Sequence, residues 1–306
     1  NRTVQNMAAL SPMMQQYFDI KKQHPDKILF FRLGDFYEMF YDDAILASKE
    51  LELTLTGRDC GQEERAPMCG VPFHSYENYV ARLIAKGYKV AICEQMEDPA
   101  LAKGLVKRDI IRVVTPGTVI ESSMLQDDKN NYIASIYITE KKAGVCFADV
   151  STGTAHATVL TGEKLGPEII SELCRYSPSE VLFNAAILDY KEVTAYIKQQ
   201  LACSVELLDE AAFAPDACME EMRAQFGDAP EKTAGLALES PAFTALAVLL
   251  GYLKETQKKG VERLKTVHNY AEAQYMQLSP VTRANLELTE TMRGREKKGT
   301  LLWVLD

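Results

Sequence analysis

The stretch Phe31-Arg32-Leu33-Gly34-Asp35-Phe36-Tyr37-Glu38-Met39-Phe40 decides how the first part of this chain folds. An apolar run over residues 27–33 precedes Gly34-Asp35, and glycine beside aspartate favours a tight turn between two strands. Because side chains alternate between the faces of a strand, Phe36 and Glu38 are expected to point the same way. A ring beside a hydrogen-bond acceptor suits inspection of DNA from the minor groove. The plainer interpretation is a core phenylalanine and a solvated glutamate.

Around this stretch the pattern predicts a small α/β domain with a mixed sheet. Ser11-Pro12 is typical of a helix start, with a capping serine followed by proline in the first turn. Asp42-Asp43 would begin a second helix, because acidic residues favour the positive end of a helix. The remaining elements expected here are strands over residues 51–56, 88–94 and 110–114, a turn-rich loop over 66–73 and a helix over 74–87.

The rest of the chain predicts a second α/β domain that opens on an antiparallel meander. Turn residues separate the expected elements. These are strands over residues 132–139, 144–149, 154–160 and 180–183, and helices over 169–174, 193–201 and 243–258. A further segment begins near Gln277, and the apolar run Leu301–Leu305 at the chain end suggests a piece of a longer protein.

Composition favours a globular protein of about two domains, with 47% hydrophobic and 25% charged residues in 306. No run has the apolar length of a membrane helix, and no signal-peptide pattern is present, so we expect an intracellular chain without membrane contact. The net charge of -9 is uneven. Residues 1–115 hold 15 basic and 16 acidic residues, whereas residues 116–306 hold 19 and 27. Any nucleic-acid contact is therefore expected in the nearly neutral first part.

The seven cysteines are scattered and form no C-x-x-C pair, which favours reduced, mostly buried thiols. Cys60, Cys69 and His74 lie within one short stretch, but their spacing matches no standard zinc site and a fourth ligand is absent. No metal site is predicted.

Taken together, the motifs of this chain resemble the MutS family, the bacterial sensors of mismatched DNA. The stretches that carry the resemblance run from one end of the chain to the other. They are Leu10–Tyr17, Phe31–Phe40, Leu55–Arg58, Pro67–His74, Cys93–Gln95, Thr115–Thr118, Thr282–Leu288 and Gly299–Asp306.

The resemblance implies an α/β fold in which residues 1–115 form a mismatch-binding domain, followed by a linker over 116–128. Residues 129–265 would be an RNase H-like connector domain, and 266–306 the truncated start of a helical core, or lever, domain. The ATPase domain of the family lies outside this sequence. We therefore expect no enzyme activity and no cofactor here, with ATP and magnesium belonging to the full-length protein.

The resemblance also assigns roles to residues. Phe36 would stack on a mispaired base from the minor groove, and Glu38 would hydrogen-bond to that base. Arg58 would contact the DNA backbone or the minor groove, with a helix-end ion pair as the alternative. The other candidates are Leu33, Asp35, Pro72, Phe73 and His74 around the same site, with a structural hydrogen bond as the alternative for His74, and Lys107, Arg108 and Arg112 as phosphate contacts or as a solvated face.

The implied partners are mismatched double-stranded DNA, and MutL through the connector domain. The family acts as a homodimer clamped on DNA, whereas this chain is expected to be monomeric and to bind DNA weakly. The resemblance places the protein in the bacterial cytoplasm, associated with the nucleoid.

The sequence also allows three other interpretations. A nuclease could use Asp149 near a strand end, but two-metal hydrolysis needs several converging carboxylates and no partner set follows. Residues 294–300 have the glycine spacing of a phosphate-binding loop without its Lys-Ser/Thr pair. An interaction module is compatible with mismatch sensing and suits the acidic second half.

Overall fold

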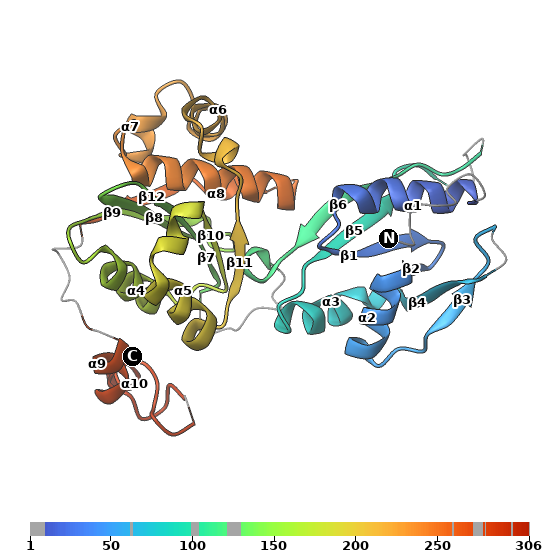
Figure 1. Ribbon diagram of the computed structural model, residues 1–306, viewed down its shortest axis with the longest axis horizontal. Coiled ribbons are helices and arrows are strands. Elements are labelled where there is room, and N and C mark those ends of the chain that lie inside the picture. The colour runs from blue at the N-terminus through green and yellow to red at the C-terminus, as the bar shows by residue number, and fades with distance from the viewer. Residues whose placement is uncertain are drawn as a thin grey trace. The chain divides into compact units, whose positions relative to one another are not determined.

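The computed structural model describes residues 10–61, 64–98, 104–120, 130–258, 260–271, 278, 280–294 and 296–305. The chain divides into two compact units. Asn1–Asn131 and Tyr252–Val261 form unit 1, and Tyr132–Gly251 and Glu262–Asp306 form unit 2. Each unit contains a 6-stranded sheet with helices packed on it, so both are α/β (Figure 1). The predicted fold class is confirmed.

The sheet of unit 1 has the strand order β3-β4-β2-β1-β5-β6. Neighbouring strands are antiparallel except for β1 and β5, which run parallel, so the sheet is mixed as predicted. The strands are β1 (Ile28–Leu33), β2 (Phe36–Phe40), β3 (Thr56–Arg58), β4 (Ala66–Pro72), β5 (Val90–Gln95) and β6 (Arg108–Val114).

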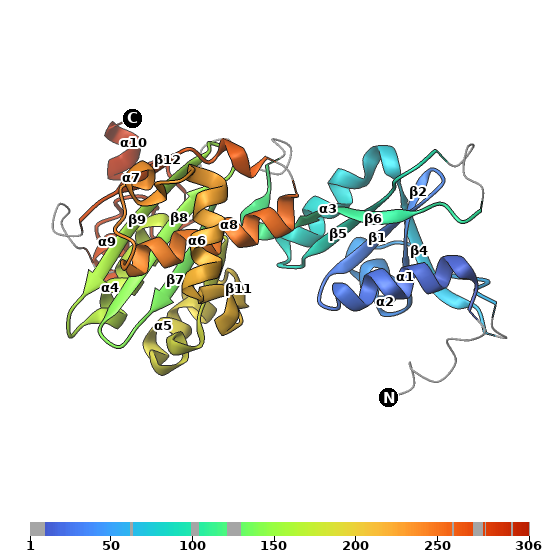
Figure 2. The same ribbon diagram turned by 90° about the horizontal axis from the view of Figure 1, so that it is seen from above.

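Helices cover both faces of this sheet, as Figures 1 and 2 show. Helix α1 (Pro12–Gln23) packs Met14 and Tyr17 on one face, beside Leu29 and Phe31 of β1. Helices α2 (Tyr41–Leu51) and α3 (Tyr76–Ala85) cover the other face, against a separate apolar cluster that includes Phe30. Alternate residues of β1 therefore enter two different cores, as the period of a strand requires.

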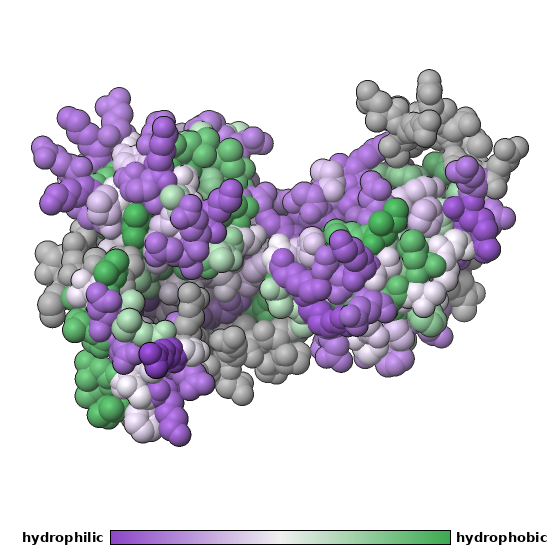
Figure 3. Space-filling view, turned by 60° about the horizontal axis from the view of Figure 1, so that its bottom comes forward, coloured by the Kyte–Doolittle hydropathy of each residue, from purple (hydrophilic) through white to green (hydrophobic). Residues whose placement is uncertain are grey.

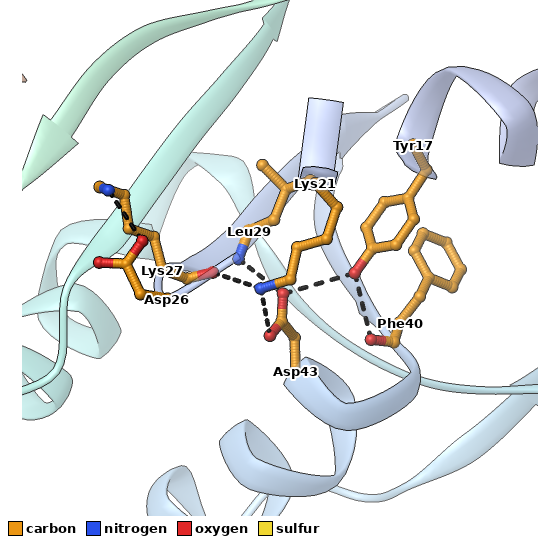
Figure 4. A network of polar contacts seen from close by, with 7 residues as sticks. All are labelled: Tyr17, Lys21, Asp26, Lys27, Leu29, Phe40 and Asp43. Atoms are coloured by element: carbon orange, nitrogen blue, oxygen red, sulfur yellow. Dashed lines mark hydrogen bonds and ion pairs between the residues drawn. The ribbon is translucent and has the colours of Figure 1, made fainter. Parts of the chain in front are cut away.

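A buried polar network joins α1, β1 and α2 (Figure 4). The carboxylate of Asp43 accepts hydrogen bonds from the backbone N–H of Leu29 at 2.9 Å and from the hydroxyl of Tyr17 at 3.4 Å. Its other oxygen forms an ion pair with Nζ of Lys21 at 2.9 Å. Lys21 also donates to the carbonyl of Lys27 at 2.6 Å. Because each buried group has a partner, the network fixes α1 and α2 to the hairpin strand β1.

The sheet of unit 2 has the order β11-β10-β7-β8-β9-β12. Strands β7, β8 and β9 form the predicted antiparallel meander, and β10, β11 and β12 add in parallel to their neighbours. This is the mixed α/β sheet expected of an RNase H-like connector. The strands are β7 (Tyr132–Ile138), β8 (Lys142–Asp149), β9 (Thr154–Thr161), β10 (Glu180–Phe183), β11 (Ser204–Leu207) and β12 (Thr266–Asn269).

Helices lie on both faces of this second sheet as well (Figure 1). Helices α4 (Leu165–Tyr176) and α5 (Lys191–Tyr196) contribute to the apolar cluster on one face. Helix α8 (Pro241–Gln257) begins on the opposite face, where a Cβ on Gly144 would meet the backbone of Pro241 at 2.0 Å. A glycine in β8 thus allows the start of α8 to touch the sheet backbone. The other helices are α6 (Pro215–Phe226), α7 (Pro230–Ala234), α9 (Pro280–Asn285) and α10 (Leu301–Leu305).

The strand predicted over residues 51–56 is wrong. Helix α2 continues to Leu51, whose side chain is buried, and Glu52 ends it in the left-handed conformation with a φ of 59°. Leu55 is exposed, so the alternating leucines mark a helix end followed by a connection. Strand β3 begins only at Thr56.

The loop predicted over residues 66–73 is also wrong, because β4 occupies most of it. Two prolines suggested a loop, since proline cannot donate a hydrogen bond within a sheet. Strand register explains why they are tolerated. Pro67 is paired only with Gly57 of β3, and Pro72 only with Phe36 of β2. Each proline therefore has a neighbouring strand on one side only.

Two predicted boundaries fall near residues outside the described part. Residues 121–128 of the predicted linker lie outside the described residues. Strand β12 joins the sheet of unit 2, so that sheet extends beyond residue 265.

Among the described residues, no helix is both long and apolar enough to cross a membrane. Apolar and hydrophilic residues are interspersed over the face that Figure 3 shows.

Candidate nucleic-acid interface

The hairpin of β1 and β2 places Phe36 at the end of the sheet. Leu33 pairs with Phe36, so Gly34 and Asp35 alone form the turn, as predicted. Gly34 has a φ of +55°, the positive value that a type II′ turn needs at its first central position. Phe36 is 47% exposed, which is unusual for a large aromatic side chain in a strand. The plainer interpretation of Phe36 as a core residue is therefore wrong.

Phe36 and Glu38 lie on the same face of the sheet, as the alternation predicted. Along β2 they are the exposed and half-buried positions, while Tyr37 between them is buried on the opposite face. Glu38 pairs with Phe31 on one side and with Gly70 on the other. Glu38 is only 13% exposed at its side chain, so it is not a freely solvated glutamate either.

The partner of Glu38 is Arg58. Nη1 of Arg58 and Oε2 of Glu38 form an ion pair, with the arginine side chain 36% exposed. Arg58 ends strand β3, so the ion pair foreseen as its alternative role exists, but between two strands and not at a helix end. Within the described part of the chain, Oε1 of Glu38 has no hydrogen-bond partner. The carboxylate is therefore held from one side and open on the other.

Gly70 provides the space for the Glu38 side chain. A Cβ at Gly70 would lie 3.3 Å from the carbonyl oxygen of Tyr37 and 3.5 Å from Cγ of Glu38. The first contact is too short for the backbone of β2 to keep its position unchanged. Glycine at this place in β4 therefore lets the Glu38 side chain lie over the neighbouring strand.

The segment after β4 packs against the turn of the hairpin. The N–H of Phe73 donates to the carbonyl of Asp35 at 2.9 Å, and Pro72 pairs with Phe36. Phe73 and His74 begin a short 3-10 helix (Phe73–Ser75), and both side chains are exposed. The structure thus brings Leu33, Asp35, Phe36, Pro72 and Phe73 together at one end of the sheet.

The three predicted phosphate contacts have different surroundings. Lys107 is exposed. Arg108 is buried, and its guanidinium donates to the carbonyl of Arg32 at 2.7 Å and to Oε1 of Gln16 at 3.1 Å. Arg112 is half-buried and donates to Gln257 at 3.1 Å. Arg108 and Arg112 act inside the fold in this structure, and the solvated-face alternative is wrong for Arg108.

Sequence reasoning missed two residues beside the hairpin. Arg32 lies over the ring of Phe73, 3.8 Å from Cζ to the ring centroid, and pairs with Glu94 of β5 at 3.2 Å. Both residues stand in stretches that carry the family resemblance, but strand spacing cannot show that β5 pairs with β1. The role of Gly70 depends on strand register, which the sequence alone does not show.

The alternative chemistries find little support. Among the described residues, no group of three or more His, Cys, Asp or Glu side chains could hold a metal ion. Asp149 is buried, and Oδ1 accepts hydrogen bonds from Ser151 and Thr152 in the turn that follows β8. Of the phosphate-loop stretch 294–300, Arg295 lies outside the described residues.

The cysteines considered for zinc lie in two different cores. Cys60 belongs to the cluster under α1, and Cys69 to the cluster under α2 and α3, on opposite faces of the sheet. Burial raises the pKa of the Cys69 thiol to about 11 and, above all other influences, that of Cys93 to about 12. These thiols are therefore protonated, buried apolar groups at neutral pH.

Comparison with known proteins adds a second kind of observation. Residues 11–123 match the family description MutS domain I, and residues 131–267 match MutS domain II. A DNA mismatch repair protein MutS from Ruminiclostridium cellulolyticum is 51% identical over 98% of this chain and 34% of its own length. Proteins of the same name from Acetivibrio thermocellus and Clostridium tetani are 50% and 48% identical, over 98% and 97% of this chain.

The chain spans about a third of the length of these curated relatives, which are 34%, 34% and 32% covered. Two domain descriptions match in succession, and the relatives are about half identical to the chain along nearly all of it. On both grounds, the chain belongs to the MutS family.

Proposed function

We propose that this chain recognises mismatched double-stranded DNA in DNA mismatch repair, with Phe36 as the wedge and Glu38 as the group that reads the base. The observation that carries the proposal is the exposed ring of Phe36 at the end of a tight hairpin. Glu38, on the same face, offers one carboxylate oxygen beside it. The names of the MutS relatives support the assignment to mismatch repair.

The physical basis of selectivity is the energy of deforming DNA. The minor groove carries a degenerate pattern of donors and acceptors, so a mispair is hard to identify from base edges alone. A wedge inserted between base steps costs a few kcal/mol of unstacking, and less where pairing is already weak. Phe36 offers a stacking surface that accepts any base. It would therefore enter mispaired steps preferentially.

Glu38 adds a penalty at correctly paired steps. A carboxylate near phosphates is unfavourable unless a hydrogen-bond donor meets it. The ion pair with Arg58 reduces this repulsion and keeps Oε2 occupied, so that Oε1 is the atom left for a base edge. Arg58 therefore belongs to the proposed site through its ion pair with Glu38, and its side chain is 36% exposed, so a phosphate could also approach it.

For unit 2 we propose the role of a connector that transmits the DNA-bound state to the ATPase domain and docks MutL. The match of residues 131–267 to MutS domain II supports this role. The excess of acidic over basic residues in positions 116–306 suits contact with protein better than contact with DNA. ATP, magnesium and the homodimer would belong to the full-length protein. The bacterial nucleoid remains the proposed location, and pull-down of unit 2 by MutL would test the docking.

The test of mismatch recognition is a binding titration of this chain with two short duplexes that differ by one central mispair. We expect tighter binding to the mispaired duplex, and a ratio of affinities near one for Phe36→Ala. Leu55→Ala is the matched control, since Leu55 is a comparably exposed apolar residue outside the hairpin. A Phe36→Ala protein with the same affinity ratio as the unchanged chain would contradict the proposal.

A further inference from the structure

Arg32 lies near the end of β1, just before the Gly34-Asp35 turn that leads to Phe36. Its contacts connect that turn to the rest of unit 1. We propose that Arg32 is a positioning residue that fixes the direction of the Phe36 ring before DNA arrives. This inference rests on the proposed wedge role of Phe36, and it assigns Arg32 no contact with DNA.

The guanidinium of Arg32 meets three different parts of the domain. Its Nε donates to the carbonyl of Gly34 at 2.5 Å, inside the turn itself. Its Cζ lies over the Phe73 ring, 3.8 Å from the ring centroid. Its Nη1 donates to Oε1 of Glu94 on β5 at 3.2 Å. One side chain therefore links the turn, the segment after β4 and a neighbouring strand.

Glu94 is itself held in place. The hydroxyl of Tyr37 donates to the same Oε1 that accepts from Arg32, and the N–H of Gln95 donates to Oε2 at 3.2 Å. Burial, and next the hydrogen bond to Glu94, raises the pKa of Tyr37 above its ordinary value. Tyr37 therefore remains a donor at any physiological pH, and the acceptor for Arg32 is fixed from two sides.

The backbone closes the arrangement around the turn. The N–H of Phe73 donates to the carbonyl of Asp35 at 2.9 Å, so the ring under Arg32 is tied to the second turn residue. Nε of Arg108 donates to the carbonyl of Arg32 at 2.7 Å, which fixes β1 just before the turn. Of the two turn residues, Gly34 is thus bonded to Arg32 itself and Asp35 to Phe73, whose ring Arg32 contacts.

These contacts favour positioning over phosphate binding. The Arg32 side chain is only 16% exposed, and its Nε and Nη1 donate to Gly34 and Glu94. A wedge that is already ordered loses less conformational entropy when it inserts between bases. A planar fork that stacks and donates at once is also something lysine cannot reproduce.

The experiment compares Arg32→Lys and Arg32→Met with the unchanged chain. Arg82→Met is the control, because Arg82 is an exposed arginine on α3 that donates to the carbonyl of Leu51, away from the hairpin. Hydrogen–deuterium exchange of peptides that cover residues 33–37 and 71–75 measures how firmly the turn is held. Titration with mispaired and fully paired duplexes measures the affinity ratio.

We expect faster exchange in both peptides and an affinity ratio reduced about two- to tenfold, the range that corresponds to ordering one side chain. Both Arg32 variants should show this, and Arg82→Met should not. If an Arg32 variant folds poorly, Phe73→Leu provides a second test. It removes the ring under the guanidinium, keeps Arg32, and should also raise exchange and lower the affinity ratio. The slope of log affinity against log salt should stay unchanged, since loss of a phosphate contact would lower it by about one.

Three results would overturn the proposal: a normal affinity ratio for Arg32→Lys, unchanged exchange at the turn, or a lower salt slope. The Phe36→Ala protein is run beside these variants. If Phe36→Ala keeps its mismatch preference, the proposed wedge role fails, and with it the effect of Arg32 on DNA selection. Exchange at the turn separates the two failures, because it reports on Arg32 without any DNA.

Discussion

Arg58 and Glu38 form an ion pair although the strands that carry them are not neighbours in the sheet. Arg58 belongs to β3 and Glu38 to β2, and β4 separates them in the sheet. Gly70, which pairs with Glu38 on β4, presents no side chain to block the contact. The charge that would repel DNA is therefore balanced within the protein before any duplex binds.

The ion pair predicts that the effects of Glu38 and Arg58 on DNA binding are coupled. Glu38→Gln should raise affinity for fully paired DNA, because it removes a negative charge, and should lower the mismatch ratio. The gain should be larger in an Arg58→Gln background, where the carboxylate is no longer balanced. A coupling of about 0.5–1 kcal/mol is expected for a partly exposed pair.

The measurement is a double-mutant cycle in which each of the four proteins is titrated with paired and mispaired duplexes. Additive effects within about 0.3 kcal/mol would show that the two residues act independently. A large loss of affinity for paired DNA in Glu38→Gln would contradict a repulsive contribution from the carboxylate.

Gly70 should tolerate no larger side chain. Gly70→Val places branched carbon atoms where even a Cβ is 3.3 Å from the carbonyl of Tyr37. We expect the free energy of unfolding to fall by about 1–3 kcal/mol, as for other overpacked sites, and the mismatch ratio to fall with it. Gly251→Ala is a useful comparison, because a Cβ there meets only the flexible side chain of Glu221, at 3.5 Å. Urea unfolding followed by duplex titration checks both effects.

The network around Asp43 should be a major source of stability for unit 1. Asp43→Ala leaves the N–H of Leu29 and the ammonium of Lys21 without their buried acceptor. A loss of about 2–4 kcal/mol in the free energy of unfolding is expected. Asp19→Ala is the control, since Asp19 forms an exposed pair with Lys22 at 3.8 Å and should change stability by less than about 0.5 kcal/mol. Equal effects of the two substitutions, measured by chemical denaturation, would argue against the network.

Unit 2 should lose stability in mild acid because of His156. Burial, then the charges of His268 and Arg175, lower the pKa of His156 below its ordinary value of 6.5. The folded state therefore binds fewer protons than the unfolded state between the lowered pKa and 6.5. Stability rises with pH across that window and is lost as pH falls through 6.5 toward the lowered pKa.

The measurement is thermal unfolding of the unchanged chain and of His156→Gln at a series of pH values. The His156→Gln protein should lose part of the pH dependence below 6.5, because glutamine does not titrate. His156 on β9 pairs with His268 on β12, so the loss of stability in acid should begin at β12. An identical pH profile for both proteins would rule out His156 as the cause.

Local chemistry predicted much of this fold. Serine before proline marks the start of α1, and the glycine-aspartate turn gives the register of β1 and β2 without any long-range information. The strand over residues 180–183 was likewise predicted with its observed limits, because three apolar residues follow Glu180 between turn signals. In these stretches the signal and its partner lie close together along the chain, whereas the alternating leucines of residues 51–55 misled because a helix end gave the same pattern.

Predictions failed where the outcome depends on a neighbour far along the chain. The prolines of β4 indicated a loop, and only the limited extent of pairing on each side explains a strand. Arg108 resembled a surface cation until its partners Gln16 and Arg32 were known. The contacts of Phe36 and Glu38 with DNA stay predictions, while their common face and the Arg58 partner are properties of the fold.

The parallel pairing of β1 with β5 has a consequence for the order of folding. The β1–β2 hairpin closes through a turn of two residues and can form in microseconds, whereas Glu94 lies 62 positions from Arg32 along the chain. Distant pairing of this kind is the slow step of such domains, because loop closure precedes any gain from contact. The hairpin can therefore form early with a turn that is only partly held. The turn gains its remaining contact, between Arg32 and Glu94, when β5 pairs with β1. During synthesis, a nascent chain whose residue 94 is still inside the ribosome lacks the Glu94 acceptor of Arg32, so one of the contacts that hold the turn is missing.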